Sequence, residues 1–278
     1  MRRRPPRSSA PAAATPDWRS YDSVAETYER VRAPLHADPA ADLVRLMELP
    51  PGGRVLDVGT GPGVAAELAG EELGAEGLVV GVDPSIGMLR TAIRRVPHVI
   101  QAQALDLPFR DGVFDGVIAT FVVFFFRRYE TGLAELSRVL RPGAELGLTT
   151  WGGGDDAFAA TWREIAEAYV GRDLLRDATR QAAPWEEHFS DPGRVKETLR
   201  DAGFRNVRVE VRTYRHTVSL EDYIAGRETS VTGRFLRGML GEALWARFHA
   251  RVTEEFRNRF PDPIGDSNDV LLTLARKP

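Results

Sequence analysis

The chain has 278 residues, 43% of them hydrophobic, with a formal net charge of −3 and no cysteine. This length fits one large domain or a core with a lid, and the missing cysteine excludes disulfides, thiolate chemistry and cysteine-ligated zinc. The five histidines are scattered without metal-ligand spacing, so we expect no bound metal. The slight acidity disfavours a nucleic-acid partner. The sequence contains no run of about 18 apolar residues, the length that a membrane-spanning helix needs.

The beginning of the chain differs in composition from the rest. Residues 1–16 carry four arginines, several prolines and no acid. They lack the apolar core of a secretory signal, so we expect a disordered tail on a cytoplasmic protein. Residues 18–49 then predict two helices, because apolar side chains between Tyr21 and Val31 recur in steps of three and four residues.

A strand, a glycine-rich turn and a second strand follow. Residues 54–58 form an apolar run that breaks into glycines at 59, 61 and 63, and the apolar run 78–82 ends at Asp83. Glycine adopts positive φ and has no Cβ to keep a ligand from the backbone, and the next helix directs its positive end to the same place. Asp83 can accept hydrogen bonds from a ribose diol. The pattern predicts a nucleoside-containing cofactor, and the alternative is a tight turn without a ligand.

The residues around the turn favour one class of cofactor. A dinucleotide site prefers G-x-G-x-x-G, whereas Val64 and Ala65 follow Gly63 here. Asp57 lies at the end of a buried strand, two residues before the first glycine, and needs a donor or a cation as partner. The amino group of an amino-acid moiety would serve, whereas a pyrophosphate would be repelled. The pattern therefore disfavours a nicotinamide cofactor.

The rest of the chain alternates strands with helices, which is typical of a parallel sheet with helices on both faces. Five further strands are predicted, over 98–102, 114–120, 144–150, 206–213 and 269–276. Further helices are predicted over 155–170, 191–203, 219–237 and 241–259. Asp191 as N-cap, Pro192 in the first turn and Gly203 as a stop support the second of these.

These motifs resemble those of the class I S-adenosylmethionine-dependent methyltransferases, in the small-molecule branch related to the ubiquinone and menaquinone methyltransferases. The resemblance is carried, in the family's order, by residues 55–63, 81–89, 104–109, 114–120 and 136–144. It implies an α/β fold with a Rossmann-like seven-stranded sheet, mostly parallel with an antiparallel last strand. A single domain over 17–278 would consist of lid helices (17–50), a core (51–216 and 268–278) and a helical insertion that completes the lid (217–267).

The resemblance also implies roles for residues. Asp57 and the glycines would hold the methionine part of S-adenosylmethionine, Asp83 the ribose, and Met88 and Asp106 the adenine. Met88 could instead be an ordinary core residue, and Asp106 a turn acid. The full set implied for the cofactor is Asp57, Gly59, Thr60, Gly61, Gly63, Asp83, Pro84, Met88, Asp106, Leu107, Thr120 and Phe121.

The sequence departs from the family after the fourth strand. Relatives often carry a polar group there, whereas residues 121–126 are all apolar. We therefore expect a hydrophobic or aromatic substrate, with Phe124, Phe125 and Trp151 in its pocket, although such a run also fits a buried strand end. Proton acceptors could come from Tyr21, Tyr28, His188 and His216, if they do not simply pack or lie on the surface.

The expected function is methyl transfer from S-adenosylmethionine to a hydrophobic small molecule, such as a specialised metabolite or a quinone-like ring. The choice between O-, N- and C-methylation stays open, and the protein would be a monomer or homodimer. The alternative is a catalytically silent relative that uses the cofactor pocket for binding or regulation.

Overall fold

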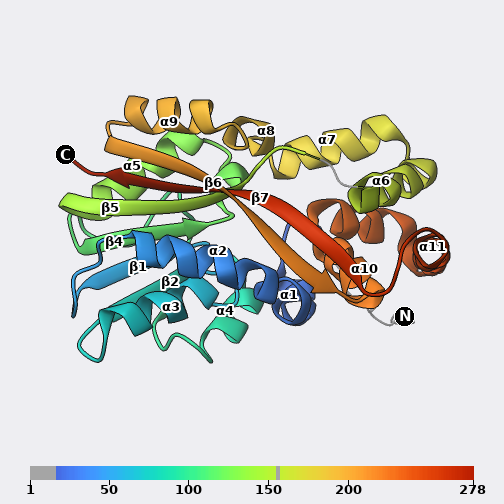
Figure 1. Ribbon diagram of the computed structural model, residues 1–278, viewed down its shortest axis with the longest axis horizontal. Helices are drawn as coiled ribbons and strands as arrows, with labels where there is room; N and C mark the ends of the chain where they lie inside the picture. Colours follow the sequence, from blue (N-terminus) through green and yellow to red (C-terminus); the bar gives the residue numbers. More distant parts are fainter. Residues whose placement is uncertain (1–16, 155–156) are drawn as a thin grey trace, which may run out of the picture.

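A computed structural model describes residues 17–154 and 157–278 as a seven-stranded sheet flanked by helices (Figure 1). The tail expected over 1–16 lies outside the described residues. The strand order is β3-β2-β1-β4-β5-β7-β6, and β7 runs antiparallel to both of its neighbours. The predicted fold class is confirmed. The strands are β1 (Arg54–Val58), β2 (Leu78–Asp83), β3 (Val99–Gln101), β4 (Phe114–Thr120), β5 (Leu140–Trp151), β6 (Arg205–Val218) and β7 (Ile264–Arg276).

Helices cover both faces of the sheet (Figure 1). One face carries α2 (Ala33–Leu46), α3 (Val64–Leu73) and α4 (Ile86–Ala92), preceded by η1 (Asp22–Val24) and α1 (Ala25–Val31). The other carries α5 (Tyr129–Val139), α8 (Glu186–Phe189) and α9 (Pro192–Asp201), with the short turn η2 (Val123–Phe125) after β4. The α9 start follows the prediction, since the Asp191 carboxylate accepts from the Arg194 N–H at 2.7 Å.

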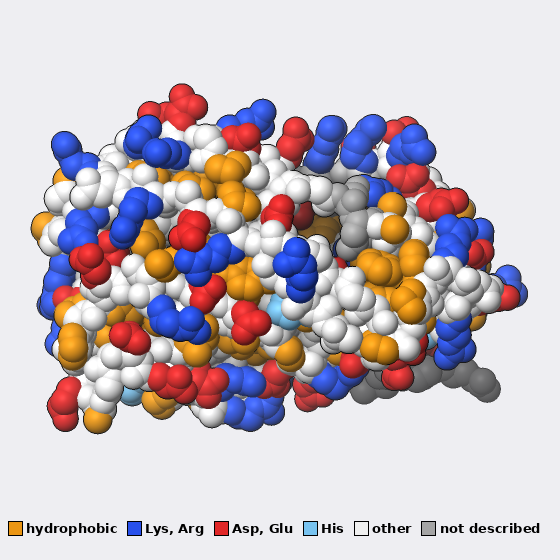
Figure 2. All heavy atoms as spheres, in the orientation of Figure 1, with side chains coloured by type: hydrophobic (Ala, Val, Ile, Leu, Met, Phe, Trp, Pro, Cys, Tyr) orange, Lys and Arg blue, Asp and Glu red, His pale blue; other side chains and the backbone are white. Residues whose placement is uncertain are grey.

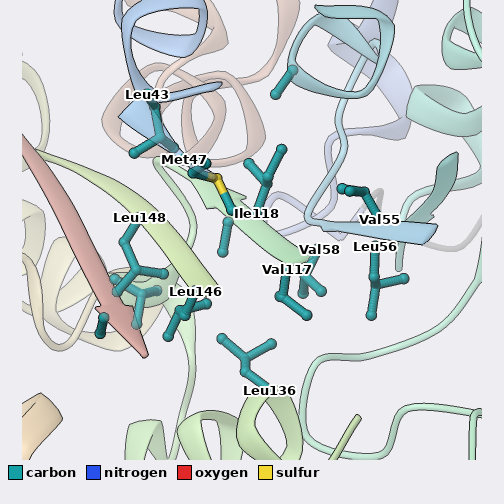
Figure 3. Close-up of a cluster of buried hydrophobic side chains, with 14 of the residues drawn as sticks. Leu43, Met47, Val55, Leu56, Val58, Val117, Ile118, Leu136, Leu146 and Leu148 are labelled. Carbon is teal, nitrogen blue, oxygen red and sulfur yellow. The ribbon is translucent and has the colours of Figure 1, made fainter. Parts of the chain in front are cut away.

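The main hydrophobic core lies on both sides of the central strands (Figure 3). Val117 and Ile118 of β4 are fully buried and point to opposite faces, as neighbours on a strand must. On one side they meet Leu136 of α5, and on the other Met47, just after α2. Gly147 of β5 permits this close approach, because a Cβ there would lie 2.5 Å from the Met47 sulfur. The chain after Leu46 is thus fixed directly on the sheet.

A second hydrophobic core lies beside the first. It joins α6 (Ala157–Val170), α7 (Arg172–Ala182), α10 (Leu220–Thr229) and α11 (Val231–Arg259) around buried aromatic side chains. The Trp162 and Phe248 rings pack edge to face at 5.1 Å between centroids. Figure 2 shows the surface hollowed between the sheet half and this helical half, with hydrophobic side chains inside the hollow.

The strands β6 and β7 are longer than predicted and connect the two cores. Their antiparallel pairing continues to Val218 opposite Ile264, so a two-stranded arm reaches from the sheet to the second core (Figure 1). The prediction missed this arm because Gly265 and the polar residues 266–269 show no apolar alternation, and a two-stranded ladder does not need one.

The helices of the insertion also differ from the prediction. A single helix was expected over 219–237, but α10 ends at Thr229, and the Ser230 hydroxyl caps α11 by accepting from the Gly233 N–H at 3.2 Å. The break expected between 237 and 241 appears as a kink at Gly241, where φ is 65°. The cap signal at Ser230 was present in the sequence and was overlooked.

Candidate functional site

The polar residues implied by the sequence meet at the carboxyl edge of the parallel strands. In register, β1 and β2 pair to Val58 opposite Val82, and β4 and β5 pair to Thr120 opposite Thr149. The residues that follow each strand therefore share one edge, which is where open α/β sheets bind ligands.

The glycine turn has left-handed backbone at each of its three glycines. Their φ values are 70° at Gly59, 53° at Gly61 and 89° at Gly63. A Cβ on Gly59 would lie 2.4 Å from the Val122 side chain, and one on Gly63 would lie 3.3 Å from Ala92. At Gly61 the nearest atom would be a backbone oxygen at 4.0 Å. Gly61 alone of the three therefore leaves open space for a ligand, and the other two permit packing within the protein.

Two buried carboxylates flank this turn. Asp57 is fully buried, and its Oδ2 accepts from the Thr60 hydroxyl at 2.7 Å. Its Oδ1 has no hydrogen-bond partner within the described part of the chain. Burial raises the pKa of Asp57 to about 7, against the effect of the Thr60 hydrogen bond. A buried acceptor without a donor is rare in proteins, and the amino group of a cofactor's methionine moiety would fit as a donor to this oxygen.

Asp83 holds the turn from the opposite side. It accepts from the backbone N–H of Gly61 at 3.0 Å and of Ser85 at 2.8 Å, one on each oxygen. Burial raises the pKa of Asp83 to about 6. Each carboxylate oxygen keeps a second lone pair, so the residue can still accept from a ribose diol. The donors and acceptors present therefore fit the cofactor that the sequence implied.

The surface around Asp106, which the resemblance implies for adenine, is more open. Asp106 is exposed and lines a surface depression together with Gln101 and Pro108. Leu107 is buried, and its N–H already donates to the Glu135 carboxylate at 2.8 Å. Two other residues implied for the cofactor also make contacts within the protein. The Pro84 carbonyl accepts a hydrogen bond from the Gln101 side chain, and the Met88 side chain is buried.

The segment before α1 docks beside Asp83, and nothing in the sequence indicated this. Asp22 accepts from the Ser85 hydroxyl at 2.7 Å and from the Gly87 N–H at 2.8 Å. A Cβ on Gly87 would lie 2.7 Å from the Asp22 Cα, so glycine is needed there for the contact. These hydrogen bonds lower the pKa of Asp22. The N-terminal segment is thus fastened to the loop that follows Asp83.

The glycine turn, Asp57 and Asp83 together form what we call the cradle. A group of rings, which we call the aromatic cluster, lies beside it. It consists of Tyr21, Tyr28, His36, Phe121, Phe125 and Trp151. The Phe121 ring stacks on the Trp151 ring at 4.1 Å and on the His36 ring at 4.6 Å between centroids. The Tyr21 ring meets Tyr28 at 5.7 Å and Phe125 at 6.2 Å. The N-cap of η1, helices α1 and α2, the segment after β4 with η2, and the end of β5 therefore all contribute to one aromatic surface.

Phe121 occupies a strained position within this cluster. Its φ is 53°, a left-handed conformation that is unusual for a bulky residue. Its N–H donates to the Thr149 carbonyl at 2.9 Å, with the Thr149 hydroxyl at 3.1 Å. Strain of this kind persists only where the surroundings enforce it, and it gathers at functional sites. The same turn brings Val122 against Gly59, and so joins the cluster to the glycine turn.

His36 is the member of the cluster that sequence reasoning missed. Its Nδ1 lies 3.2 Å from the Tyr28 hydroxyl oxygen, and its Nε2 is buried with no partner in the described ranges 17–154 and 157–278. Burial, with the nearby charge of Arg32, holds the pKa of His36 well below its usual value, so the imidazole is neutral. Burial likewise raises the pKa of Tyr28. A histidine on an apolar helix face carries no local signal that could have identified it.

Other predicted site residues lie elsewhere. The His188 Nε2 lies 2.8 Å from the Thr198 hydroxyl oxygen, and its ring stacks on Tyr129, between α5, α8 and α9. The structure does not bring it together with Tyr21 and Tyr28. Phe124 is 4% exposed and belongs to the main core, and its ring lies 4.6 Å from the Phe125 ring of the cluster, between centroids.

The ionisation of the two cradle acids predicts how cofactor affinity depends on pH. Their pKa values of about 7 and about 6 lie above the ordinary 3.8, so both are protonated in mild acid. We expect affinity for S-adenosylhomocysteine to rise from about pH 5 to about pH 8, because the ionised carboxylates accept the cofactor's hydrogen bonds. Stability of the ligand-free protein should fall as pH rises from 3.8 toward 7, since the folded state holds these protons more tightly than the unfolded chain.

Calorimetric titration across this range checks the expectation. Asp57→Asn should flatten the upper part of the profile. An affinity that is independent of pH from 5 to 8 would contradict the assignment of these acids.

Among the described residues, no cluster of three or more histidine, aspartate or glutamate side chains is arranged to hold a metal ion. The same residues include no helix that is both long and apolar enough to cross a membrane.

Comparisons with known proteins agree with this geometry. A family model described as a methyltransferase domain matches residues 56–148. The demethylmenaquinone methyltransferase of Listeria welshimeri is 28% identical over 212 residues, which cover 68% of this chain and 87% of that protein.

Two solved structures share the fold. The YcgJ protein of Bacillus subtilis has a TM-score of 0.55 and 17% identity, covering 86% of this chain and 98% of that one. Phosphoethanolamine N-methyltransferase 2 of Haemonchus contortus, solved with S-adenosyl-L-methionine, has a TM-score of 0.56 and 17% identity. The match covers 92% of this chain and 57% of that one. The matched model assigns a methyltransferase domain to residues 56–148, and the chain is similar to the demethylmenaquinone methyltransferases and shares the fold of S-adenosylmethionine-dependent methyltransferases.

Proposed function

We propose that this methyltransferase acts on a hydrophobic aromatic small molecule, such as a quinone-like ring or a specialised metabolite. The observation that carries the proposal is the aromatic cluster beside the cradle. Rings that stack at 4.1 to 4.6 Å, as Phe121 does with Trp151 and His36, present flat apolar surface suited to a planar acceptor. The relatives named for demethylmenaquinone favour the same class of substrate.

The cofactor would be held at the carboxyl edge. Asp57 would accept from its amino group, Asp83 from the ribose hydroxyls and Asp106 from the adenine amino group, with the Gly61 backbone in close approach. Gly59, Thr60, Gly63, Thr120 and Phe121 would shape this cradle. When bound, S-adenosylmethionine supplies an electrophilic methyl group. The protein's part is to orient the acceptor and exclude water.

The helical half would act as a lid, together with the N-terminal helices. Arg30 of α1 forms an ion pair with Asp222 of α10, and Arg234 of α11 lies over the Tyr21 ring at 3.7 Å. Arg234 is 4% exposed and donates to the Trp18 carbonyl at 2.9 Å. These contacts tie the second core to the aromatic cluster. Tyr21 and Tyr28 would therefore face the acceptor under this lid, and we propose them as positioning residues.

We propose a free small molecule, rather than a polymer, as the methyl acceptor. Figure 2 shows acidic and basic side chains interspersed over the visible face, without a broad basic area for a nucleic-acid backbone. We propose a monomer or homodimer that takes a free small molecule.

A panel of acceptors tests the proposal. Purified protein with S-adenosylmethionine is offered hydroxylated naphthalenes, quinols, aromatic amines and aliphatic alcohols, and product is detected by mass spectrometry and by S-adenosylhomocysteine release. Methylation confined to the aromatic acceptors is expected. Tight cofactor binding without methylation of any panel member would favour the catalytically silent alternative.

Trp151 provides a sharper prediction for this pocket. Trp151→Ala removes one wall of the stack, so we expect KM for an aromatic acceptor to rise about tenfold or more, because a buried aromatic surface is worth about 1.5–3 kcal/mol. Trp151→Phe should retain much of the affinity. Unchanged S-adenosylhomocysteine binding in both variants serves as the control, and an unchanged KM in Trp151→Ala would count against the aromatic pocket.

A further inference from the structure

Arg32 is a half-buried cation without an anionic partner. It caps the C-terminus of α1 through its N–H, which donates to the Tyr28 carbonyl at 2.8 Å. Its side chain makes no ion pair with any carboxylate in the described part of the chain. By contrast, Arg30 on the same helix pairs with Asp222 and is 56% exposed. An arginine that is held half-buried and yet pairs with no carboxylate of the described chain needs another explanation.

The position of Arg32 supplies that explanation. Its guanidinium carbon lies 5.9 Å from the centroid of the Trp151 ring. The Arg32 Cδ also lies 3.2 Å from where a Cβ on Gly226 of α10 would be, so the side chain runs between the proposed lid and the aromatic cluster. The cation therefore borders the surface on which we place the acceptor ring.

A buried nitrogen without a hydrogen-bond partner borders the same ring. The His36 imidazole lies 5.5 Å from the Trp151 ring, and its Nε2 is buried without a hydrogen-bond partner among the described residues. Its other nitrogen is already engaged with the Tyr28 hydroxyl at 3.2 Å. A cation and an unpartnered nitrogen beside one aromatic wall are what a negatively charged oxygen on a planar ligand would satisfy.

We propose that Arg32 and His36 form a subsite for an ionised oxygen on the aromatic acceptor, the oxygen of an acidic phenol, an enol or a carboxylate. The inference rests on the proposed aromatic substrate and narrows it to acceptors that bind as anions. Arg32 pairs with the charge, and the His36 Nε2 hydrogen-bonds the same oxygen while Tyr28 holds the opposite nitrogen. His36 and Arg32 here bind and orient the acceptor.

Two naphthoquinones that differ by one methyl group test this subsite. Full-length protein saturated with S-adenosylhomocysteine is titrated with 2-hydroxy-1,4-naphthoquinone, which is ionised at neutral pH, and with its neutral 2-methoxy ether. We expect the anion to bind about tenfold more tightly, the scale of a hydrogen bond to a charged group. The ratio of the two affinities is the readout, so no turnover is needed.

Variants assign the preference to residues. Arg32→Gln should abolish the preference while leaving affinity for the ether unchanged. His36→Phe, which retains a ring to stack on Phe121, should reduce it in part. Arg45→Gln is the matched control, an arginine on α2 with a side chain 67% exposed, whose loss should leave the ratio unchanged because exposed ion pairs contribute little.

The outcomes separate this inference from the proposed function. Equal affinity for the two compounds in the wild-type protein overturns the anion subsite, as does a preference that persists in Arg32→Gln. If neither compound binds, the subsite is also overturned, and the acceptor panel then decides independently whether an aromatic substrate stands.

Discussion

Asp83→Ala should lower the affinity for S-adenosylhomocysteine by about ten- to a hundredfold, because hydrogen bonds to a charged acceptor contribute about 1.5–3 kcal/mol. The carboxylate is buried beside the glycine turn and holds the Gly61 N–H at 3.0 Å. Its loss therefore removes the ribose acceptor and loosens the turn at the same time. Isothermal titration with the wild type in parallel measures the effect.

Two comparisons make that result specific. Asp83→Asn keeps one acceptor oxygen and the shape, so its loss should be smaller. Asp173→Ala, at a side chain 85% exposed on α7, should bind like the wild type. If folded Asp83→Ala retained wild-type affinity, the placement of the ribose at this strand end would be wrong.

Trp162→Ala should lower the free energy of unfolding by about 3–5 kcal/mol, the usual cost of removing a large buried aromatic side chain. Trp162 is 1% exposed at the centre of the second core, where it meets Phe248 edge to face. Denaturant unfolding followed by circular dichroism measures the loss.

The lid proposal adds a functional consequence to this variant. Because the cradle residues lie on the other core, affinity for S-adenosylhomocysteine should fall much less than activity toward an aromatic acceptor. Trp162→Phe, which preserves an aromatic ring, should lose no more than about half as much stability. A Trp162→Ala protein as stable as the wild type would show that the second core does not depend on this ring.

The sheet could be predicted from sequence because its signals are local. The apolar run 54–58 and its glycines marked β1 and the turn, and Phe114–Thr120 was located to the residue. Asp57 and Asp83 were found because an acid at the end of a buried strand is anomalous, and anomalies stand out without any knowledge of tertiary contacts.

The remainder depends on contacts between distant segments. His36 meets Phe121, which lies 85 residues later, and Asp22 meets Ser85 across 63 residues. Neither pair leaves a pattern in the sequence nearby. Even the glycines were interpreted too simply, since Gly59 makes room for Val122 rather than for a ligand. His188 looked equally suitable by its sequence position, but the fold directs it to Thr198.

The central claim, that the cradle binds S-adenosylmethionine, is tested most directly by calorimetric titration of the purified protein with S-adenosylhomocysteine, with NADH as the control. The account predicts saturable binding of S-adenosylhomocysteine at about micromolar affinity, the scale of about 8 kcal/mol, and none of NADH. Binding of NADH without S-adenosylhomocysteine would contradict the assignment of the turn, of Asp57 and of the cofactor together.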